Sequence, residues 1–213
     1  MHTVLLTGFE PFDKDLINPS WEAVRRLDGV QLSEDVQIVA RQLPCAFATA
    51  GACLTQMINE LQPAMVIATG LGPGRSDLSV ERVAINVNDA RIPDNLGEQP
   101  VDTAVVAHGP AAYFSTLPIK AMVNAVREAG GAASVSQTAG TFVCNQVFYL
   151  LQHALAETGV RSGFIHVPYL PEQVVKSGQP SMALATMVEG LRVAASAAWH
   201  TRVDVAEVGG QVS

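Results

Sequence analysis

Short apolar runs alternate with longer amphipathic segments along the chain, and this alternation most constrains the fold. Apolar runs lie at residues 3–7, 36–40, 65–69 and 164–167, and the more polar residues 133–137 are also expected to form a strand. Helix-like segments lie between or after them, at residues 46–61, 118–129, 144–158 and 182–198. Strands of a parallel sheet are buried on both faces, so their sequences are continuously apolar, and helices connect them. The alternation predicts one α/β domain over residues 1–213, a three-layer α/β/α sandwich around a mostly parallel, twisted central sheet.

Local signals set several element boundaries. Asn18 and Pro19 suit the N-cap and the first position of a further helix. Gly8 is expected to end the first strand, and the alternating residues 83–87 predict another strand. Residues 203–213 have little pattern, and we expect a loose C-terminal tail there.

Charge and hydropathy exclude several classes of partner. The 213 residues include 13 Lys and Arg against 20 Asp and Glu, a formal net charge of −7, while 48 % are hydrophobic. This balance disfavours nucleic acid and anionic membranes as partners. No apolar run approaches the ~20 residues of a membrane-spanning helix. The first residues lack the basic region of a signal peptide, so we expect a cytoplasmic protein without a membrane partner.

The cysteines are Cys45, Cys53 and Cys144, an odd number without paired spacing. Neither a disulfide framework nor a metal site is expected, and no cofactor is implied. Cys45 and Cys53 suit buried apolar positions. Cys144 differs, because it follows a strand–turn junction at the expected start of a helix. Free N–H groups and the helix dipole there favour a thiolate and can bind an oxyanion. Cys144 is therefore a candidate nucleophile.

A nucleophilic thiol needs a base, and His166 is the best placed of five histidines. It lies near the carboxyl end of an apolar strand, where parallel sheets place their sites. A third group must hold the tautomer of the imidazole, and the candidates are Glu81, Asp89 and Asp94. Plainer interpretations remain open for each: a core histidine, a surface ion pair of Glu81 with Arg75 or Arg82, and an ordinary turn at Asp94.

The segment Gly70-Leu71-Gly72-Pro73-Gly74 raises the alternative of a nucleotide-binding or phosphorylase-like domain. Its G-x-G spacing is followed by arginine where a dinucleotide fingerprint has glycine, and Pro73 removes one N–H donor. No Gly-Lys-Ser/Thr sequence of a phosphate loop occurs in the chain. The segment therefore favours an unusual turn beside a pocket over a phosphate cradle.

Four long stretches together resemble the pyroglutamyl peptidase I family of cytosolic cysteine peptidases. They span most of the chain, from residue 7 to about residue 191, in the order and spacing of the family. They are Thr7-Gly8-Phe9-Glu10-Pro11-Phe12 with Asn18-Pro19-Ser20; Glu81-Arg82-Val83-Ala84-Ile85-Asn86 running to Asp89-Ala90-Arg91-Ile92-Pro93-Asp94-Asn95; Ser136-Gln137-Thr138-Ala139-Gly140-Thr141-Phe142-Val143-Cys144-Asn145; and Phe164-Ile165-His166-Val167-Pro168.

The resemblance implies an exopeptidase that removes an N-terminal pyroglutamyl (5-oxoprolyl) residue through a thioester. It implies that Cys144 is the nucleophile, His166 the base and acid, and Glu81 the residue that orients His166. The oxyanion donors would be Arg91 and the Cys144 N–H. The lactam pocket would comprise Phe9, Phe12, Asn18, Leu71, Ile92, Phe142 and Val143. The family fold is an α/β/α sandwich, and its members are homo-oligomers, commonly dimers or tetramers.

Two segments depart from the family pattern. Asp13-Lys14-Asp15-Leu16-Ile17 replaces a glycine-rich piece, and Leu71 replaces a glutamine. If that glutamine amide binds the lactam, its loss lowers affinity, because the ring loses a hydrogen-bond partner. A non-catalytic or altered-specificity relative that binds pyroglutamyl peptides therefore remains an alternative. The positions implied for catalysis are all present.

Overall fold

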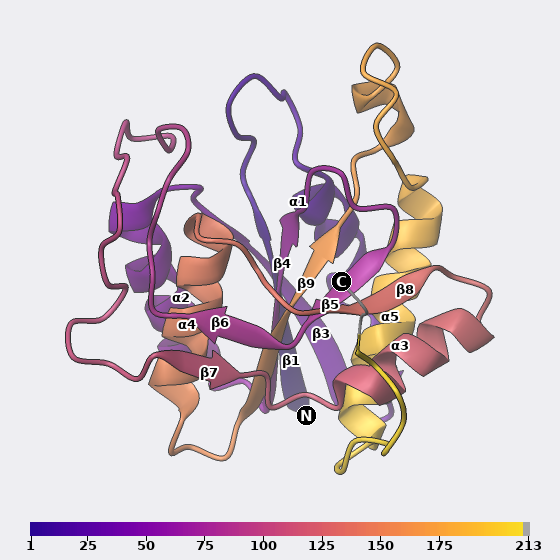
Figure 1. Ribbon diagram of the computed structural model, residues 1–213. Coiled ribbons are helices and arrows are strands. Elements are labelled where there is room, and N and C mark those ends of the chain that lie inside the picture. The colour runs from indigo at the N-terminus through magenta and orange to yellow at the C-terminus, as the bar shows by residue number, and fades with distance from the viewer. Residues whose placement is uncertain (211–213) are drawn as a thin grey trace.

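A central seven-stranded sheet organises the computed structural model, which describes residues 1–210 (Figure 1). From edge to edge the strands are β2 (Gln31–Ser33), β3 (Val36–Leu43), β1 (His2–Phe9), β4 (Met65–Leu71), β9 (Arg161–Val167), β5 (Leu78–Glu81) and β8 (Ala133–Ser136). β6 (Val83–Ile85) and β7 (Ala112–Phe114) form a separate antiparallel ribbon. The helices are α1 (Pro19–Val24), α2 (Phe47–Leu61), α3 (Ile119–Glu128), α4 (Val143–Leu155) and α5 (Leu184–His200), with short 3₁₀ turns at Arg25–Leu27 and Pro171–Gln173.

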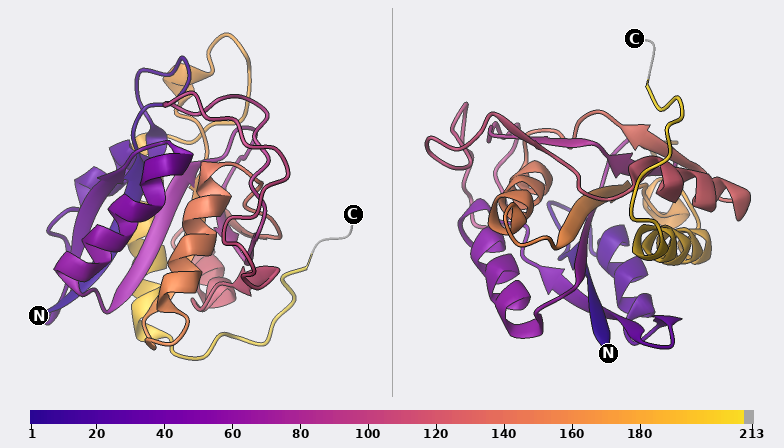
Figure 2. Two further views of the ribbon diagram at one scale, coloured as in Figure 1. Left: turned by 90° about the vertical axis from the view of Figure 1, so that its left-hand side faces the viewer. Right: turned by 90° about the horizontal axis from the view of Figure 1, so that it is seen from below.

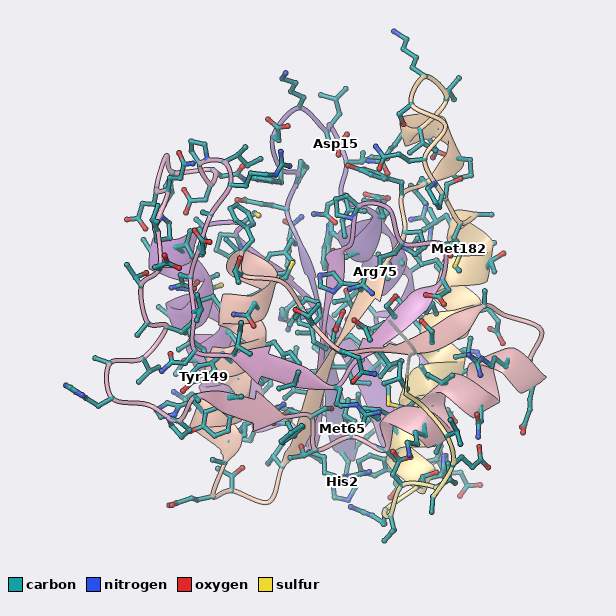
Figure 3. The ribbon with its side chains drawn as sticks, in the orientation of Figure 1. His2, Asp15, Met65, Arg75, Tyr149 and Met182 are labelled. Carbon is teal, nitrogen blue, oxygen red and sulfur yellow. The ribbon has the colours of Figure 1, made fainter. Side chains whose placement is uncertain are left out.

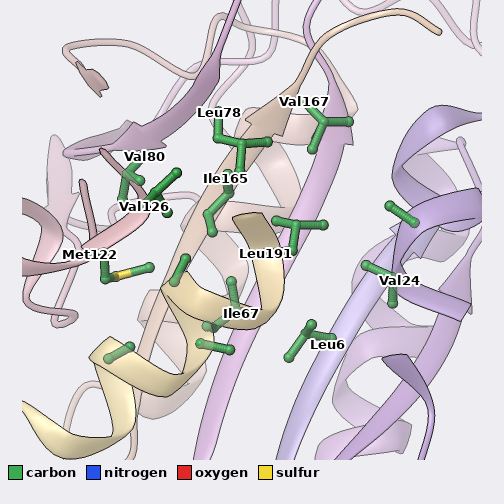
Figure 4. Close-up of a cluster of buried hydrophobic side chains, with 14 of the residues drawn as sticks. Leu6, Val24, Ile67, Leu78, Val80, Met122, Val126, Ile165, Val167 and Leu191 are labelled. Carbon is green, nitrogen blue, oxygen red and sulfur yellow. The ribbon is translucent and has the colours of Figure 1, made fainter. Parts of the chain in front are cut away.

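Helices cover both faces of the sheet, which makes the three layers that the alternation predicts (Figures 1 and 2). One core, which includes Leu6, Ile67 and Ile165, packs against α1, α3 and α5 (Figure 4). The other includes Val66 and Phe164 and packs against α2 and α4. Neighbouring residues of β4 thus face opposite cores, so the strand is apolar throughout its length.

The direction of the sheet reverses between β9 and β5. β1 pairs in parallel with β3 and β4, and β4 with β9, whereas β5 is antiparallel to β9 and parallel to β8. The sequence pattern does not predict β5, because the alternation of apolar and polar residues in this strand covers only four positions and the strands that pair with it lie far away in sequence. Residues 83–87 were expected to form a strand, but only 83–85 do, in the ribbon outside the main sheet.

The first strand continues through Gly8 to Phe9, so the prediction that it ends at Gly8 is wrong. Gly8 serves a packing purpose, because a Cβ there would lie 2.6 Å from the Trp21 backbone nitrogen. The helix α1 therefore crosses β1 at close range. Its start matches the prediction: Asn18 is the N-cap, accepts a hydrogen bond from the Ser20 N–H, and precedes Pro19.

Part of the expected loose tail is held against the body of the protein. The Asp204 carboxylate accepts hydrogen bonds from the backbone N–H groups of Lys120 and Ala121, at the start of α3. The Gly209 carbonyl accepts hydrogen bonds from Arg82 and Gln137. Residues 204 and 209 thus contact the body of the protein, residues 211–213 lie outside the described residues, and the loose tail stays a prediction.

Among residues 1–210, no helix combines the length and the apolar character needed to cross a membrane.

Candidate active site

Cys144 lies in the first turn of α4, as the strand–turn–helix sequence predicts. Gly140 has a φ of 77°, which turns the chain from the loop after β8 towards this helix. Gly70, near the end of β4, leaves room for the thiol, because a Cβ on Gly70 would lie 2.7 Å from the Cys144 sulfur. Gly70 is also paired in register with His166 on β9. The nucleophile candidate therefore lies over the end of β4, next to the strand that carries the base candidate.

His166 and Glu81 form a buried pair across two antiparallel strands. His166 Nδ1 lies 2.7 Å from Glu81 Oε1, and the two side chains are 7 % and 0 % exposed. The register pairs His166 with Ser79, so Glu81 lies two positions farther along the same face of β5. Of the three acidic candidates, Glu81 is the one that contacts the imidazole. The arrangement holds Nδ1 and leaves Nε2 for the cavity side.

The other two acidic candidates have different roles. Asp94 accepts hydrogen bonds from the Phe47 N–H at the start of α2 and from Leu96 and Glu98 in its own turn. The plainer interpretation of Asp94 as a turn residue is therefore correct, with a helix cap added to it. Asp89 is exposed, and its backbone rather than its carboxylate is tied to Thr141.

Glu81 also contacts Arg75, one of the two arginines considered as ion-pair partners. Arg75 Nη2 lies 3.3 Å from Glu81 Oε1. Arg82 points elsewhere, because its Nε donates to Gln137 Oε1 at 2.9 Å. From the sequence, orientation of His166 and an ion pair with an arginine are alternative roles for Glu81. In the structure Glu81 makes both contacts.

Burial raises the pKa of the Cys144 thiol well above its ordinary value, and Cys45 and Glu81 act in the same direction. A backbone hydrogen bond at Cys144 lowers this pKa, as expected at the start of a helix, but its effect is smaller. The helix start therefore acts on the pKa of the thiol in the expected direction, but burial has the larger effect. The thiol needs a group that accepts its proton, and His166 is the imidazole facing the same cavity.

A cavity of about 470 Å³ opens beside Cys144 and His166. Phe9, Phe12, Ile92 and Phe142 contribute its apolar wall. The Phe142 ring centroid lies 5.1 Å from those of both Phe12 and Phe47, so this wall is a packed aromatic cluster. The volume suits a small ring with part of a peptide attached.

The structure brings most of the predicted pocket residues together. Leu71, Arg91 and Asn18 also line the cavity. Asn18 already donates one amide hydrogen to the Glu10 carbonyl, and its oxygen caps α1. Val143 does not line the cavity, because its side chain is fully buried in the core behind α4. Its immediate neighbours on both sides face the cavity instead.

Sequence reasoning missed several cavity residues. Cys45 precedes α2 and lines the cavity, and burial raises its pKa to about 12. Asp13 and Asp15, from the segment that departs from the family pattern, line it together with Tyr169. Arg75 was considered only as an ion-pair partner. No local pattern marks these residues, because they come from four separate loops that only the fold brings to one place.

The 70–74 segment lacks the architecture of a phosphate site. Such sites place a loop before a helix N-terminus, whereas here β4 continues to β5 without a helix. Gly72 packs against His166 and Arg75, because a Cβ there would lie 3.1 Å from the His166 Cβ and 2.7 Å from the Arg75 Cγ. The turn thus forms a wall of the cavity, which favours the pocket interpretation over nucleotide binding.

Comparisons with known proteins agree with this geometry. The sequence model of the family described as pyroglutamyl peptidase matches residues 2–201. A pyrrolidone-carboxylate peptidase of Pseudomonas fluorescens is 81 % identical over 213 residues, which is 100 % of both chains. A crystal structure of pyroglutamyl peptidase I from Bacillus amyloliquefaciens superposes with a TM-score of 0.93 at 44 % identity, covering 96 % of this chain and 100 % of that one. The pyrrolidone carboxyl peptidase of Thermococcus litoralis gives 0.90 at 38 % identity, covering 94 % of each chain. On the family match and these identities, the chain belongs to the pyroglutamyl peptidase family.

Proposed function

We propose that this protein is a cysteine exopeptidase that removes an N-terminal pyroglutamyl residue from peptides by acyl transfer. One observation carries the proposal beyond family membership. Cys144 and the buried His166–Glu81 pair face one cavity with an aromatic and aliphatic wall. A thiol, a base and an orienting carboxylate are the groups that acyl transfer by cysteine requires.

The wall of the cavity suits a neutral lactam. An ordinary aminopeptidase must bind a charged amine, which calls for a carboxylate or a metal. A pyroglutamyl ring has no such charge and needs apolar walls with one or two hydrogen bonds to its amide. Phe12, Ile92 and Phe142 supply the walls, and Phe142 lies two residues before the thiol, so the ring can lie beside it. The remaining amide hydrogen of Asn18 or a loop backbone group supplies the polar contact.

The reaction then proceeds through a thioester. His166 Nε2 takes the thiol proton while the sulfur attacks the carbonyl carbon that follows the ring, forming a C–S bond. The Cys144 N–H and Arg91 bind the negative oxygen, and loss of one such donor typically lowers the rate about 10²–10³-fold. The C–N bond breaks as His166 gives its proton to the leaving amine. Water, deprotonated by His166, attacks the thioester and releases pyroglutamate and the thiol.

Glu81 keeps the imidazole in the tautomer that this path needs. With Nδ1–H donating to Glu81 Oε1, the lone pair of Nε2 is free to accept the thiol proton. The carboxylate also stabilises the imidazolium that forms. Because a neutral thiol must give up its proton to this ring, activity depends on the Glu81–His166 pair as well as on the thiol.

Two further features complete the proposal. The path requires Cys144 to be a reduced thiol and is lost on oxidation, so a reducing compartment such as the cytoplasm suits it. We also propose a homo-oligomer, a dimer or a tetramer, as the family resemblance implies. Sedimentation velocity would measure its size, and a monomer over micromolar concentrations would contradict the oligomer.

The test is release of a fluorophore from a pyroglutamyl amide in the presence of a reducing agent. Wild type is expected to hydrolyse the amide, and Cys144→Ser to lose at least about 10³-fold in kcat, because a hydroxyl is the weaker nucleophile here. Glu81→Gln is expected to lower kcat more than KM. Cys53→Ser is the matched control, because Cys53 is a half-buried helix residue outside the cavity and its loss leaves kcat unchanged.

Each alternative has its own outcome. A catalytically inactive wild type that binds a pyroglutamyl peptide in calorimetry would identify a binding protein instead. Thermal stabilisation by nucleotide and not by pyroglutamate would favour the nucleotide-binding alternative. Activity that survives in Cys144→Ser would exclude Cys144 as the nucleophile.

A further inference from the structure

Arg75 contacts the site but takes no part in the acyl transfer described above. Its Nη2 lies 3.3 Å from Glu81 Oε1 and donates to the Thr138 carbonyl at 3.1 Å. The side chain is 31 % exposed and lines the cavity. Figure 3 labels Arg75 near the upper ends of β5 and β9, below Asp15. Arg75 thus links the loop after β4, the orienting carboxylate and the loop that leads to Cys144.

The Glu81 carboxylate depends on this contact because it is fully buried. Its side chain is 0 % exposed, and both of its contacts fall on Oε1. Within the described part of the chain, Oε2 is buried and accepts no hydrogen bond. A buried carboxylate without a countercharge is strongly disfavoured. An arginine carries its charge at every working pH, whereas His166 carries one only while protonated.

The local chain fixes Arg75 in this place. Its backbone N–H donates to the Gly72 carbonyl at 3.1 Å, which closes a tight turn. A Cβ on Gly72 would lie 2.7 Å from the Arg75 Cγ and 3.1 Å from the His166 Cβ. The stem of Arg75 and the imidazole therefore pack on the same glycine. The absence of a side chain at Gly72 lets the guanidinium and the imidazole approach one carboxylate oxygen together.

Other ionisable groups around the pair do not replace Arg75. Asp13 and Asp15 come from the β1–α1 loop, Cys45 precedes α2, Asp89 and Arg91 follow β6, Cys144 lies on α4, and Tyr169 follows β9. Among the residues the structure describes, none of these hydrogen-bonds Glu81. Arg75 is thus the permanently charged group in contact with the carboxylate.

We propose that Arg75 is a positioning residue that keeps Glu81 ionised and aimed at His166 through the steps in which the imidazole is neutral. This inference rests on the proposed function. While His166 is protonated, its charge and that of Arg75 both face Glu81. Once His166 has given its proton to the leaving amine, Arg75 alone balances the carboxylate. Without Arg75, the buried Glu81 carboxylate has no permanent countercharge and no longer holds the Nδ1–H tautomer once His166 is neutral.

The experiment compares Arg75→Gln and Arg75→Lys with wild type over pH 5–9. Arg75→Gln is expected to lower kcat about ten- to a hundredfold, which is the effect of losing a hydrogen bond to a charged group. KM is expected to change by less than about threefold. The acid limb of kcat/KM is expected to move to higher pH, because a carboxylate without its cation is protonated more easily. Arg75→Lys is expected to recover part of kcat and to bring the acid limb of kcat/KM most of the way back to its wild-type pH.

Arg82→Gln is the matched control. It removes the same charge one residue from Glu81, but its guanidinium donates to Gln137 and to the Gly209 carbonyl and does not line the cavity. Its pH profile is expected to superimpose on that of wild type. Added guanidinium chloride at about 10 mM, far below denaturing levels, is expected to restore part of the activity of Arg75→Ala, because the space left by the side chain opens to the cavity.

Two results would overturn the proposal. An unchanged acid limb in a folded Arg75→Gln would exclude a role through Glu81, and a rise in KM alone would make Arg75 a substrate contact. The ¹H NMR signal of the His166 Nδ1–H supplies a readout without turnover. The signal is expected in wild type. On acidification, it is expected to disappear at a higher pH in Arg75→Gln than in wild type. If wild type does not hydrolyse the amide, the proposed function fails, while this signal still decides the role of Arg75.

Discussion

At the scale of single residues, the absence of a side chain shapes the site as much as the reactive groups do. Gly70 and Gly72 lie at the end of β4, and each leaves the space that a functional side chain occupies. Cys144 lies over Gly70, and the imidazole of His166 packs on Gly72. Neither glycine has a positive φ, so backbone conformation does not require glycine at these positions. The close approach of neighbouring side chains does.

Gly70→Ala tests this point. The new methyl group would lie 2.7 Å from the Cys144 sulfur and 3.0 Å from Phe164, so the thiol must move. We expect kcat to fall at least about tenfold, because misplaced reacting atoms lose near-attack geometry. The unfolding free energy is expected to fall by about 1–3 kcal/mol from overpacking. Amide hydrolysis and urea unfolding measure the two effects.

Gly51→Ala is the control for overpacking away from the site. Its methyl group would meet a Leu150 side-chain carbon at 2.4 Å, between α2 and α4. A loss of stability with unchanged kcat is expected there. Equal kcat in Gly70→Ala and wild type would contradict the placement of the thiol over Gly70.

At the scale of elements, an asparagine holds the β6 segment on the helix that carries the nucleophile. Asn145 follows Cys144 on α4 and is fully buried. Its Oδ1 accepts from the Ile85 N–H, and its Nδ2 donates to the carbonyls of Ile85 and Val87. The segment that leads to Arg91 is therefore tied at Ile85 and Val87 to the helix whose first turn supplies the thiol.

Asn145→Ala is expected to lower the unfolding free energy by about 2–3 kcal/mol, because partly buried backbone groups lose their partners. It is also expected to lower kcat, since the segment before Arg91 loses its attachment to α4. Thermal or urea unfolding and amide hydrolysis would measure both. Asn124→Ala, which removes an exposed contact with Glu207, is the control with little expected effect. Unchanged stability in Asn145→Ala would contradict the role of Asn145 in holding the β6 segment on α4.

At the scale of the whole molecule, the C-terminal segment completes an element far away in sequence. The N-cap residue of α3, Pro118, offers no side-chain cap. The Asp204 carboxylate supplies it instead, accepting from the N–H groups of Lys120 and Ala121. The negative charge also lies at the positive end of the helix dipole. The end of the described chain thereby fastens α3 to the sheet beside β8.

Asp204→Ala is expected to lower the unfolding free energy by about 0.5–2 kcal/mol, the usual effect of losing a cap. Because Asp204 lies outside the cavity, kcat/KM is expected to stay unchanged at temperatures where the protein is folded. Urea unfolding and amide hydrolysis on the same preparation would measure both. Asp204→Asn keeps an acceptor and should lose less stability. A parallel loss of activity in the folded variant would mean that α3 is coupled to the site.

The amino-acid sequence alone determined the class of fold and most of its helices. Its signals are local: continuous apolar runs and the Asn18-Pro19 start of α1. It also determined the candidates for the site, since Cys144 follows a strand–turn junction and His166 lies in an apolar strand. Such patterns are carried by neighbouring residues, so they can be read without the rest of the chain.

The tertiary structure alone decided how those pieces meet. β5 has only four residues, and its place in the sheet follows from pairing with β9 and β8, whose residues lie 50 or more positions away. The choice among three acidic residues depended on that pairing, which brings Glu81 to His166. The sequence likewise offered Arg75 and Arg82 equally, and only packing on Gly72 directs Arg75 to the carboxylate. Contacts between distant segments leave no local period, and they set the geometry of this site.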